Sequence, residues 1–220
     1  MLLADTCRRS TPEQVVKEVE DLFAKGVRDF AFYDDALLVD SGHHIKPILR
    51  AIGLHSSGAR FHTPNGLHAR FVDQEIAWLM KKAHFRSIRL GLESVDSTRQ
   101  KLTGDKVSNL EMERAVAYLK KEGFSKKEIG VYLMYGLPGQ EWGEVRDGVN
   151  FLKSLGVSIY LTEFSPVRGT QSWSDLVRKG VIHDNLDPLL TNNTVFSYLY
   201  SGYDPGEMKV MKLEVKRYNT

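Results

Sequence analysis

The chain has 220 residues, which is enough for one domain with a full hydrophobic core but short of the about 250 residues of a complete eight-unit βα barrel. Its 30 Lys and Arg residues nearly balance its 28 Asp and Glu residues, so the net charge of +2 gives no reason to expect binding to a nucleic acid or an anionic membrane. No apolar run approaches the roughly 18 residues of a membrane span, and the start lacks signal-peptide architecture, so we expect a cytoplasmic protein. The single cysteine, Cys7, excludes an internal disulfide and a cysteine-ligated metal site.

Helix-patterned and strand-patterned segments alternate along the chain. Ser10 or Thr11 can cap the first helix, Pro12 suits its first turn, and Gly26 ends it. The expected strands then span residues 27–33, 59–63, 86–92, 128–135 and 157–164, and the helices between them span residues 45–54, 73–83, 109–122 and 141–155. This alternation predicts parallel βα units with five strands, each preceded by a helix. Since a βα barrel normally opens with a strand, the first strand is expected to be missing.

The tail after the fifth strand has a different pattern. Trp173, Leu176 and Val177 suggest a short helix, an Asn/Asp/Thr-rich loop follows, and a final helix is expected from near Asp204. We therefore predict an α/β fold, a partial TIM-type barrel of five parallel strands with outer helices over residues 1–170, and a C-terminal helical extension over residues 171–220 packed on the same domain. Alternation along the strands predicts an inner wall built from Phe30, Phe32, Ile88, Leu90, Val131, Leu133, Ile159 and Leu161.

Polar residues follow the carboxyl ends of these strands, where such barrels place their chemistry. Asp34 and Asp35 follow the first strand, where they could bind a cation or ribose hydroxyls or cap the next element, and Asn65 follows the second. Glu93 directly follows the third strand, and its neighbour Ser94 equally fits a cap. A carboxylate in that position needs a partner if it is buried, so a functional role is predicted for Glu93.

The partners expected for Glu93 are Asp35, through a shared ligand or cation, and the guanidinium groups of Arg168 or Arg89. Glycines in two further strand-end loops, Gly136–Gly139 and Pro166–Thr170, allow close backbone approach.

Four of these strand ends together resemble motifs of the radical S-adenosylmethionine (radical SAM) enzymes, most of all the bacterial proteins with a cobalamin-binding-like domain before the radical SAM core. Residues 32–37 resemble the second-strand motif, and residues 91–94 resemble the fourth-strand motif, whose acidic residue and its neighbour contact the ribose and methionine parts of the cofactor. Residues 135–140 resemble the fifth-strand motif beside the adenine, and residues 165–170 resemble the sixth-strand end. The resemblance extends to about Thr170 and implies a (β/α)6 partial barrel. It implies cofactor-binding roles for Asp34, Asp35, Asn65, Gly91, Glu93, Ser94, Gly136, Pro138 and Pro166.

The CxxxCxxC motif of that family, whose three thiolates hold a four-iron four-sulfur cluster, is missing from the chain. Cys7 resembles a linker position after the motif, and one thiolate cannot replace three. An internal start codon, a wrongly assigned gene start or a deliberate truncation would each give such a chain. In complete relatives the cluster reductively cleaves S-adenosylmethionine to a 5′-deoxyadenosyl radical. We expect this chain to be inactive by itself and to bind the cofactor at most weakly.

Two other functions are compatible with the pattern. Asp34, Asp35, His62, Glu93 and Glu163 all lie at strand ends and could form the site of a divalent-metal-dependent barrel enzyme. The second alternative function is a non-catalytic interaction scaffold, because an open barrel exposes a strand edge through which two copies could pair as a homodimer. The sequence identifies no substrate.

Overall fold

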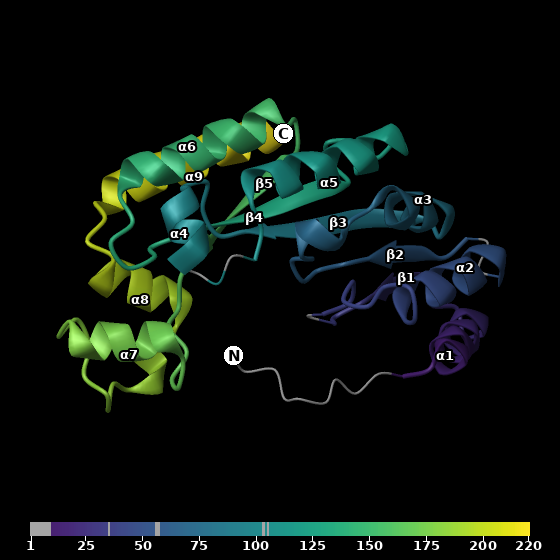
Figure 1. Cartoon of the computed structure of the whole chain (residues 1–220), viewed down its shortest axis with the longest axis horizontal. Coiled ribbons are helices and arrows are strands. Elements are labelled where there is room, and N and C mark those ends of the chain that lie inside the picture. The colour runs from purple at the N-terminus through teal and green to yellow at the C-terminus, as the bar shows by residue number, and fades with distance from the viewer. Residues whose placement is uncertain (1–9, 35, 56–57, 103, 105) are drawn as a thin grey trace.

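Five strands form one parallel sheet in this computed structural model, which describes residues 10–34, 36–55, 58–102, 104 and 106–220 (Figure 1). The strand order is β1-β2-β3-β4-β5, so neighbours along the chain are also neighbours in the sheet. This arrangement confirms the parallel α/β partial barrel predicted from the sequence. The strands are β1 (Asp29–Ala31), β2 (Arg60–His62), β3 (Phe85–Leu92), β4 (Ile129–Tyr135) and β5 (Ser158–Glu163).

A helix precedes each strand, as predicted. Capping explains where two of these helices begin: Thr11 and Gln14 exchange side-chain-to-backbone hydrogen bonds at the start of α1, and Ser108 and Glu111 do the same at the start of α5. The five helices are α1 (Pro12–Ala24), α2 (Ile45–His55), α3 (Gln74–Lys82), α5 (Asn109–Lys121) and α6 (Trp142–Ser154).

Further helices lie at the carboxyl end of the strands and in the tail. They are η1 (Ala69–Phe71), α4 (Ser97–Leu102), α7 (Gln171–Arg178), η2 (Pro188–Thr191), α8 (Asn193–Tyr200) and α9 (Pro205–Asn219). The sequence pattern did not indicate α4, which is short and largely polar, or α8, whose Asn-Thr start follows a loop-like stretch. No helix in the described part of the chain has the length and apolar character needed to cross a membrane.

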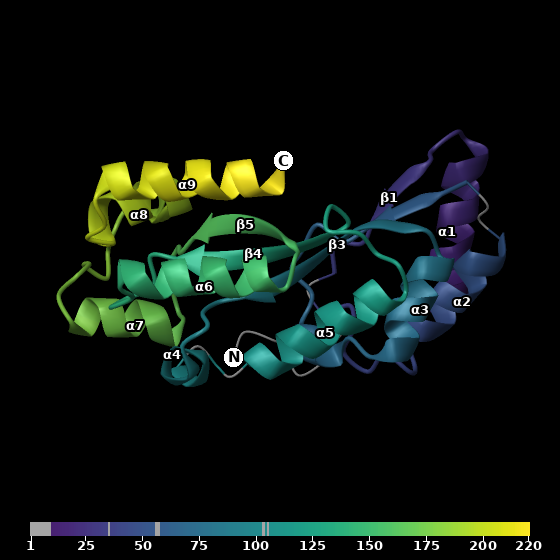
Figure 2. The same ribbon diagram turned by 90° about the horizontal axis from the view of Figure 1, so that it is seen from above.

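The inner wall predicted from the sequence is wrong, because the apolar side chains of the strands lie on the other face. Leu90 and Val131 are fully buried in one hydrophobic core with helix residues such as Met80 and Leu119. Figure 2 shows α3, α5 and α6 along that side of the sheet. The helices α2, α3, α5 and α6 contribute their apolar residues to this same core, so the apolar members of each alternating pair pack against them. The other residues predicted for the inner wall also belong to this core or pack against it. They are Phe30, Phe32, Ile88, Leu133, Ile159 and Leu161.

The opposite face of the sheet is polar and aromatic, and we call it the polar face. His62 Nδ1 lies 2.8 Å from Ser87 Oγ, and the Arg89 guanidinium stacks on the ring of Tyr160. The members of the polar face are Asp29, Arg60, His62, Ser87, Arg89, Tyr132 and Tyr160.

Helix α9 covers the free edge of β5. The side-chain oxygen of Asn219 accepts a hydrogen bond from the Ile159 N–H (2.9 Å), and its amide nitrogen donates to the Ile159 carbonyl (2.7 Å). One side-chain amide therefore satisfies both backbone groups that a further strand would use.

A second, smaller hydrophobic core lies beyond the carboxyl ends of β4 and β5. It is formed by Leu137, Phe164, Trp173, Leu176, Ile182 and Phe196, and it joins α7 and α8 to the end of the sheet (Figure 1).

Candidate functional site

A cavity of about 340 Å³ opens at the carboxyl ends of β3, β4 and β5. This is the edge at which parallel α/β proteins bind ligands. The cavity is lined by Gly66, Leu67, His68, Gly91, Leu92, Glu93, Lys106, Val107, Tyr132, Met134 and Thr162.

Two glycines let the chain pass close to itself beneath this cavity. A Cβ atom on Gly66 would lie 3.2 Å from both the Cα and the N of Gly91, which is closer than a side chain tolerates without movement. The loop is held there by a backbone bridge from Leu67 to Leu90 and by the Tyr132 hydroxyl, which donates to the Pro64 carbonyl at 2.7 Å. The result is a cradle whose floor is backbone.

Glu93 points into the cavity, where its carboxylate accepts a hydrogen bond from Lys106 Nζ at 2.8 Å. The prediction that Arg168 or Arg89 pairs with Glu93 is wrong. Arg168 pairs with Asp184, and Arg89 contacts Tyr160. Lys106 follows α4 in a loop with no periodic pattern, so nothing in the sequence indicated it.

His68 lines the same cavity. Its partial burial and the nearby cationic groups of Lys106 and Arg70 hold the pKa of its imidazole below the usual value, so the ring is neutral at physiological pH.

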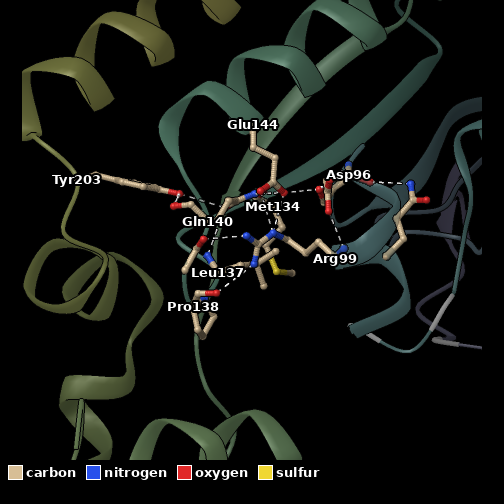
Figure 3. A network of polar contacts seen from close by, with 11 residues as sticks. Asp96, Arg99, Met134, Leu137, Pro138, Gln140, Glu144 and Tyr203 are labelled. Atoms are coloured by element: carbon tan, nitrogen blue, oxygen red, sulfur yellow. Dashed lines mark hydrogen bonds and ion pairs between the residues drawn. The ribbon is translucent and has the colours of Figure 1, made fainter. Parts of the chain in front are cut away.

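Ser94 is buried and bonds to a polar network beside the cavity. Figure 3 shows this network around Asp96, Arg99 and Glu144. The Ser94 hydroxyl donates to Glu144 at the start of α6 and accepts from the Asp96 N–H at 3.0 Å. Arg99 of α4 binds the same Glu144 carboxylate at 2.7 Å, and both side chains of this pair are only 15% exposed. Ser94 therefore links β3 to α4 and α6. It does not cap α4, because Asp96 does so by accepting a hydrogen bond from the Arg99 N–H at 2.8 Å.

The same arginine holds the loop that follows β4. Its Nη1 donates to the Pro138 carbonyl at 3.0 Å and its Nη2 to the Gly139 carbonyl at 2.9 Å (Figure 3). From the other side, the Tyr203 hydroxyl donates to the Gln140 carbonyl at 2.9 Å. Gly136, at the start of this loop, has a φ of 83°, a conformation that favours glycine.

The remaining predicted residues that the structure describes do not line this cavity. Asp34 accepts a hydrogen bond from the Ala36 N–H (2.8 Å) and lies in a separate cavity of about 500 Å³ at the outer edge of β1. Asn65 donates to the Tyr33 carbonyl at 2.9 Å, beside the cradle. Pro166 lines a third cavity of about 230 Å³, between the end of β5 and α7. Asp35 lies outside the described residues. Gly91 and Glu93 are thus the two predicted residues that the structure brings to one cavity.

The residues proposed for a divalent-metal site have separate partners. His62 contacts Ser87 and Asp29 through its two ring nitrogens, while Glu163 accepts hydrogen bonds from the Tyr135 hydroxyl (2.5 Å) and Lys212 Nζ (2.7 Å). Across the described ranges, no three His, Cys, Asp or Glu side chains are grouped so that they could hold a metal ion.

The chain does not fit a four-iron four-sulfur cluster by itself. Such clusters are held by several cysteine thiolates, and this sequence contains one cysteine, Cys7, which lies outside the described residues.

Comparison with known proteins agrees with the fold. Two structures of the radical S-adenosylmethionine methyltransferase TsrM from Kitasatospora setae superpose with TM-scores of 0.67 and 0.68, each at 20% sequence identity. One contains cobalamin and a [4Fe-4S] cluster, and the other contains the tryptophan substrate and the SAM analogue aza-SAM. The matches cover 78% of this chain but only 34% and 33% of TsrM, so the chain spans about a third of that protein.

No curated protein sequence is significantly similar to the chain. The family model "Radical SAM superfamily" matches residues 4–152, which include all of β1 to β4 and most of α6. The relatives of this family bind S-adenosylmethionine and a [4Fe-4S] cluster, as the TsrM structures illustrate. This chain therefore belongs to the radical SAM superfamily.

Proposed function

We propose that this chain forms the S-adenosylmethionine-binding wall of a radical SAM site, and that the cavity at the ends of β3, β4 and β5 receives the cofactor. The observation that carries the proposal is the backbone cradle of Gly66 and Gly91 with the Glu93 carboxylate at its mouth. A carboxylate accepts hydrogen bonds from both hydroxyls of a ribose, and a floor without side chains admits a flat ligand.

Three further predicted residues act around this cavity in the proposal, namely Ser94, Gly136 and Pro138. Ser94 positions Glu93 by fixing the turn after β3, and the loop of Gly136 and Pro138 is held by Arg99 for contact with the adenine. The cofactor supplies the hydrogen-abstracting chemistry of the superfamily only beside a reduced cluster. Because one cysteine cannot hold that cluster, we propose that the isolated chain does not cleave S-adenosylmethionine.

Calorimetry with S-adenosylhomocysteine, a stable cofactor analogue, tests the binding site. Glu93→Gln should weaken binding by at least about tenfold, since hydrogen bonds to charged groups contribute about 1.5–3 kcal/mol. The exposed Glu113→Gln on α5 is the matched control and should bind like the wild type. Equal affinities for wild type and Glu93→Gln would overturn the assignment.

The stability of the same variant separates a binding role from a structural one. The Glu93 and Lys106 side chains are 21% and 54% exposed, so the loss of their ion pair should change the free energy of unfolding by less than about 1 kcal/mol. A large loss of stability in Glu93→Gln without ligand would make Glu93 a structural residue instead.

Anaerobic reconstitution with iron and sulfide tests the second part of the proposal. The isolated chain should not develop the broad absorption near about 400 nm that iron–sulfur clusters give. A stable four-iron signal that disappears in Cys7→Ser would contradict it.

A further inference from the structure

The polar face carries two arginines, of which Arg60 pairs with a carboxylate and Arg89, in the part of the chain that the structure describes, bonds only to neutral oxygen atoms. Arg60 Nε donates to the Asp29 carboxylate at 2.6 Å, and its Nη2 pairs with the second carboxylate oxygen. Arg89 has no carboxylate partner within the described residues: its Nη2 donates to the Tyr160 hydroxyl at 3.1 Å and its Nη1 to the Ile88 carbonyl at 3.4 Å. A guanidinium has five N–H donors in a planar fork, so Arg89 retains donors for an anion.

The surroundings of Arg89 hold its guanidinium in place. Its Cζ lies 4.6 Å from the centre of the Tyr160 ring, and its backbone N–H donates to Thr63 Oγ1 at 3.0 Å. This packing depends on a glycine between them, because a Cβ atom on Gly130 would lie 2.5 Å from a Tyr160 ring carbon and 2.9 Å from Arg89 Cδ. A side chain already ordered before binding loses little entropy when a ligand arrives.

Arg89 lies on the same face of β3 as the proposed cofactor cavity. Arg89, Gly91 and Glu93 alternate along the strand, so the Cα atoms of Arg89 and Glu93 are about 13 Å apart at roughly 3.3 Å per residue. Gly91 leaves the surface between them free of a side chain. Tyr132 lines the cavity, and its ring centre lies 5.8 Å from that of Tyr160, so the two positions adjoin.

We propose that Arg89 and Tyr160 bind the carboxylate of the molecule that reacts with the cofactor, and that this second substrate carries its carboxylate on a planar apolar group. The proposal rests on the proposed function for its placement beside S-adenosylmethionine. A guanidinium recognises a carboxylate through two parallel hydrogen bonds, and the rings of Tyr132 and Tyr160 offer flat apolar surfaces beside it.

Benzoate is the simplest probe of this chemistry, and neutral benzamide is its matched control. Titrated into the full chain at constant ionic strength, benzoate should give saturable NMR shifts at Arg89, Gly130 and Tyr160, and benzamide should bind at least about tenfold more weakly. Arg89→Gln should lose benzoate binding by at least about tenfold, while Arg89→Lys, which keeps the charge but not the fork, should fall between Arg89→Gln and the wild type.

Arg60→Gln is the control on the protein side, because Arg60 lies on the same face but is already paired with Asp29. It should bind benzoate like the wild type. Equal benzoate affinities for the two glutamine variants, or shifts confined to residues away from β3, β4 and β5, would overturn the proposal.

S-adenosylhomocysteine separates this inference from the proposed function. Arg89→Gln should keep the wild-type affinity for that analogue, and Glu93→Gln should keep the wild-type affinity for benzoate. If Arg89→Gln loses both ligands, Arg89 binds the cofactor's own carboxylate and the second-substrate assignment is wrong. If Glu93→Gln has no effect on the analogue while Arg89→Gln still loses benzoate, the cofactor site is wrong and the carboxylate site stands.

Discussion

Two buried serines near the ends of β3 and β4 differ in how their hydroxyl groups are satisfied. The Ser94 hydroxyl bonds to Glu144 and to the Asp96 N–H, whereas Ser197 Oγ on α8 is fully buried with no hydrogen-bond partner in the described part of the chain. Ser197 faces Gly136, where a Cβ atom would come within 3.3 Å of its oxygen. A buried hydroxyl without a partner has lost water without gaining a bond, so it destabilises the fold.

Replacing each serine by alanine should therefore affect the free energy of unfolding differently. Ser197→Ala should leave the free energy of unfolding unchanged or raise it by up to about 1 kcal/mol, whereas Ser94→Ala should lower it by about 1–3 kcal/mol. Urea unfolding measures both. A clear loss of stability in Ser197→Ala would show that its hydroxyl has a partner in solution.

Gly130 allows a second test at the scale of single residues. Gly130→Ala should lower the free energy of unfolding by about 1–3 kcal/mol, because its Cβ would overlap Tyr160 and Arg89. A Cβ atom on Gly143 in α6 would have no heavy atom within 4 Å outside its own helix backbone. Gly143→Ala should therefore be neutral or stabilising by up to about 1 kcal/mol. Similar unfolding curves for the two variants would mean that Tyr160 and Arg89 move aside without cost.

At the scale of elements, Glu163 joins α9 to the carboxyl ends of β4 and β5. Burial alone would raise the pKa of this carboxyl group, but hydrogen bonds from Lys212 and Tyr135 outweigh it and hold the pKa below the usual value. Burial, together with the hydrogen bond to Glu163, raises the pKa of the Tyr135 phenol. A carboxyl group with a depressed folded-state pKa stabilises the fold above its unfolded-state value of about 4.3, and that contribution is lost as the pH falls through the folded-state pKa.

Glu163→Gln should therefore flatten the acid side of the stability profile. Wild-type stability should fall more steeply than that of the variant below about pH 4.5, while near neutral pH the variant should be less stable by about 1–2 kcal/mol. Urea unfolding between about pH 3 and pH 7 measures the difference. Glu214→Gln removes the ion pair with Lys153, in which the carboxylate is 46% exposed against 13% for Glu163, so it should change both limbs little. Parallel profiles for Glu163→Gln and wild type would show that the Glu163 carboxylate does not set the acid limb.

Local signals predicted most elements well, while contacts between elements could not be predicted. The cap at Thr11, the first-turn Pro12 and the spacing of apolar residues placed the helices before the strands to within one or two residues. Alternation identified the two faces of each strand but not which face the helices cover, so the predicted inner wall was assigned to the wrong side. Glu93 was predicted from its position after β3, but Lys106 was not, because a long-range ion pair leaves no local pattern.

At the scale of the whole molecule, the two edges of the sheet differ. Asn219 satisfies the backbone of Ile159 on the β5 side, whereas no described strand pairs with the outer edge of β1. Pairing between two copies through an open edge was expected from the sequence and stays a prediction.

Asn219→Leu should expose the β5 edge. We expect a loss of about 1–3 kcal/mol in the free energy of unfolding, since two backbone groups lose their partner, and concentration-dependent dimers in light scattering. Lys216→Leu adds the same side chain to an exposed position of α9 and leaves both hydrogen bonds between Asn219 and Ile159 in place, so it should stay like the wild type. Dimers in Lys216→Leu but not in Asn219→Leu would attribute association to surface hydrophobicity and not to the edge.

The position of Asn219 also matters while the chain is being made. It lies 60 residues after Ile159, and at about 5–20 residues per second roughly 3–12 s pass between synthesis of the strand and synthesis of its cap. The sequential strand order allows β1 to β5 to pair one after another during that time. Until α9 arrives, β5 presents a row of unpaired amides and carbonyls, and the nearest partners are other chains growing on the same messenger. The translation rate over residues 164–219 thus determines how long this edge is open to mispairing.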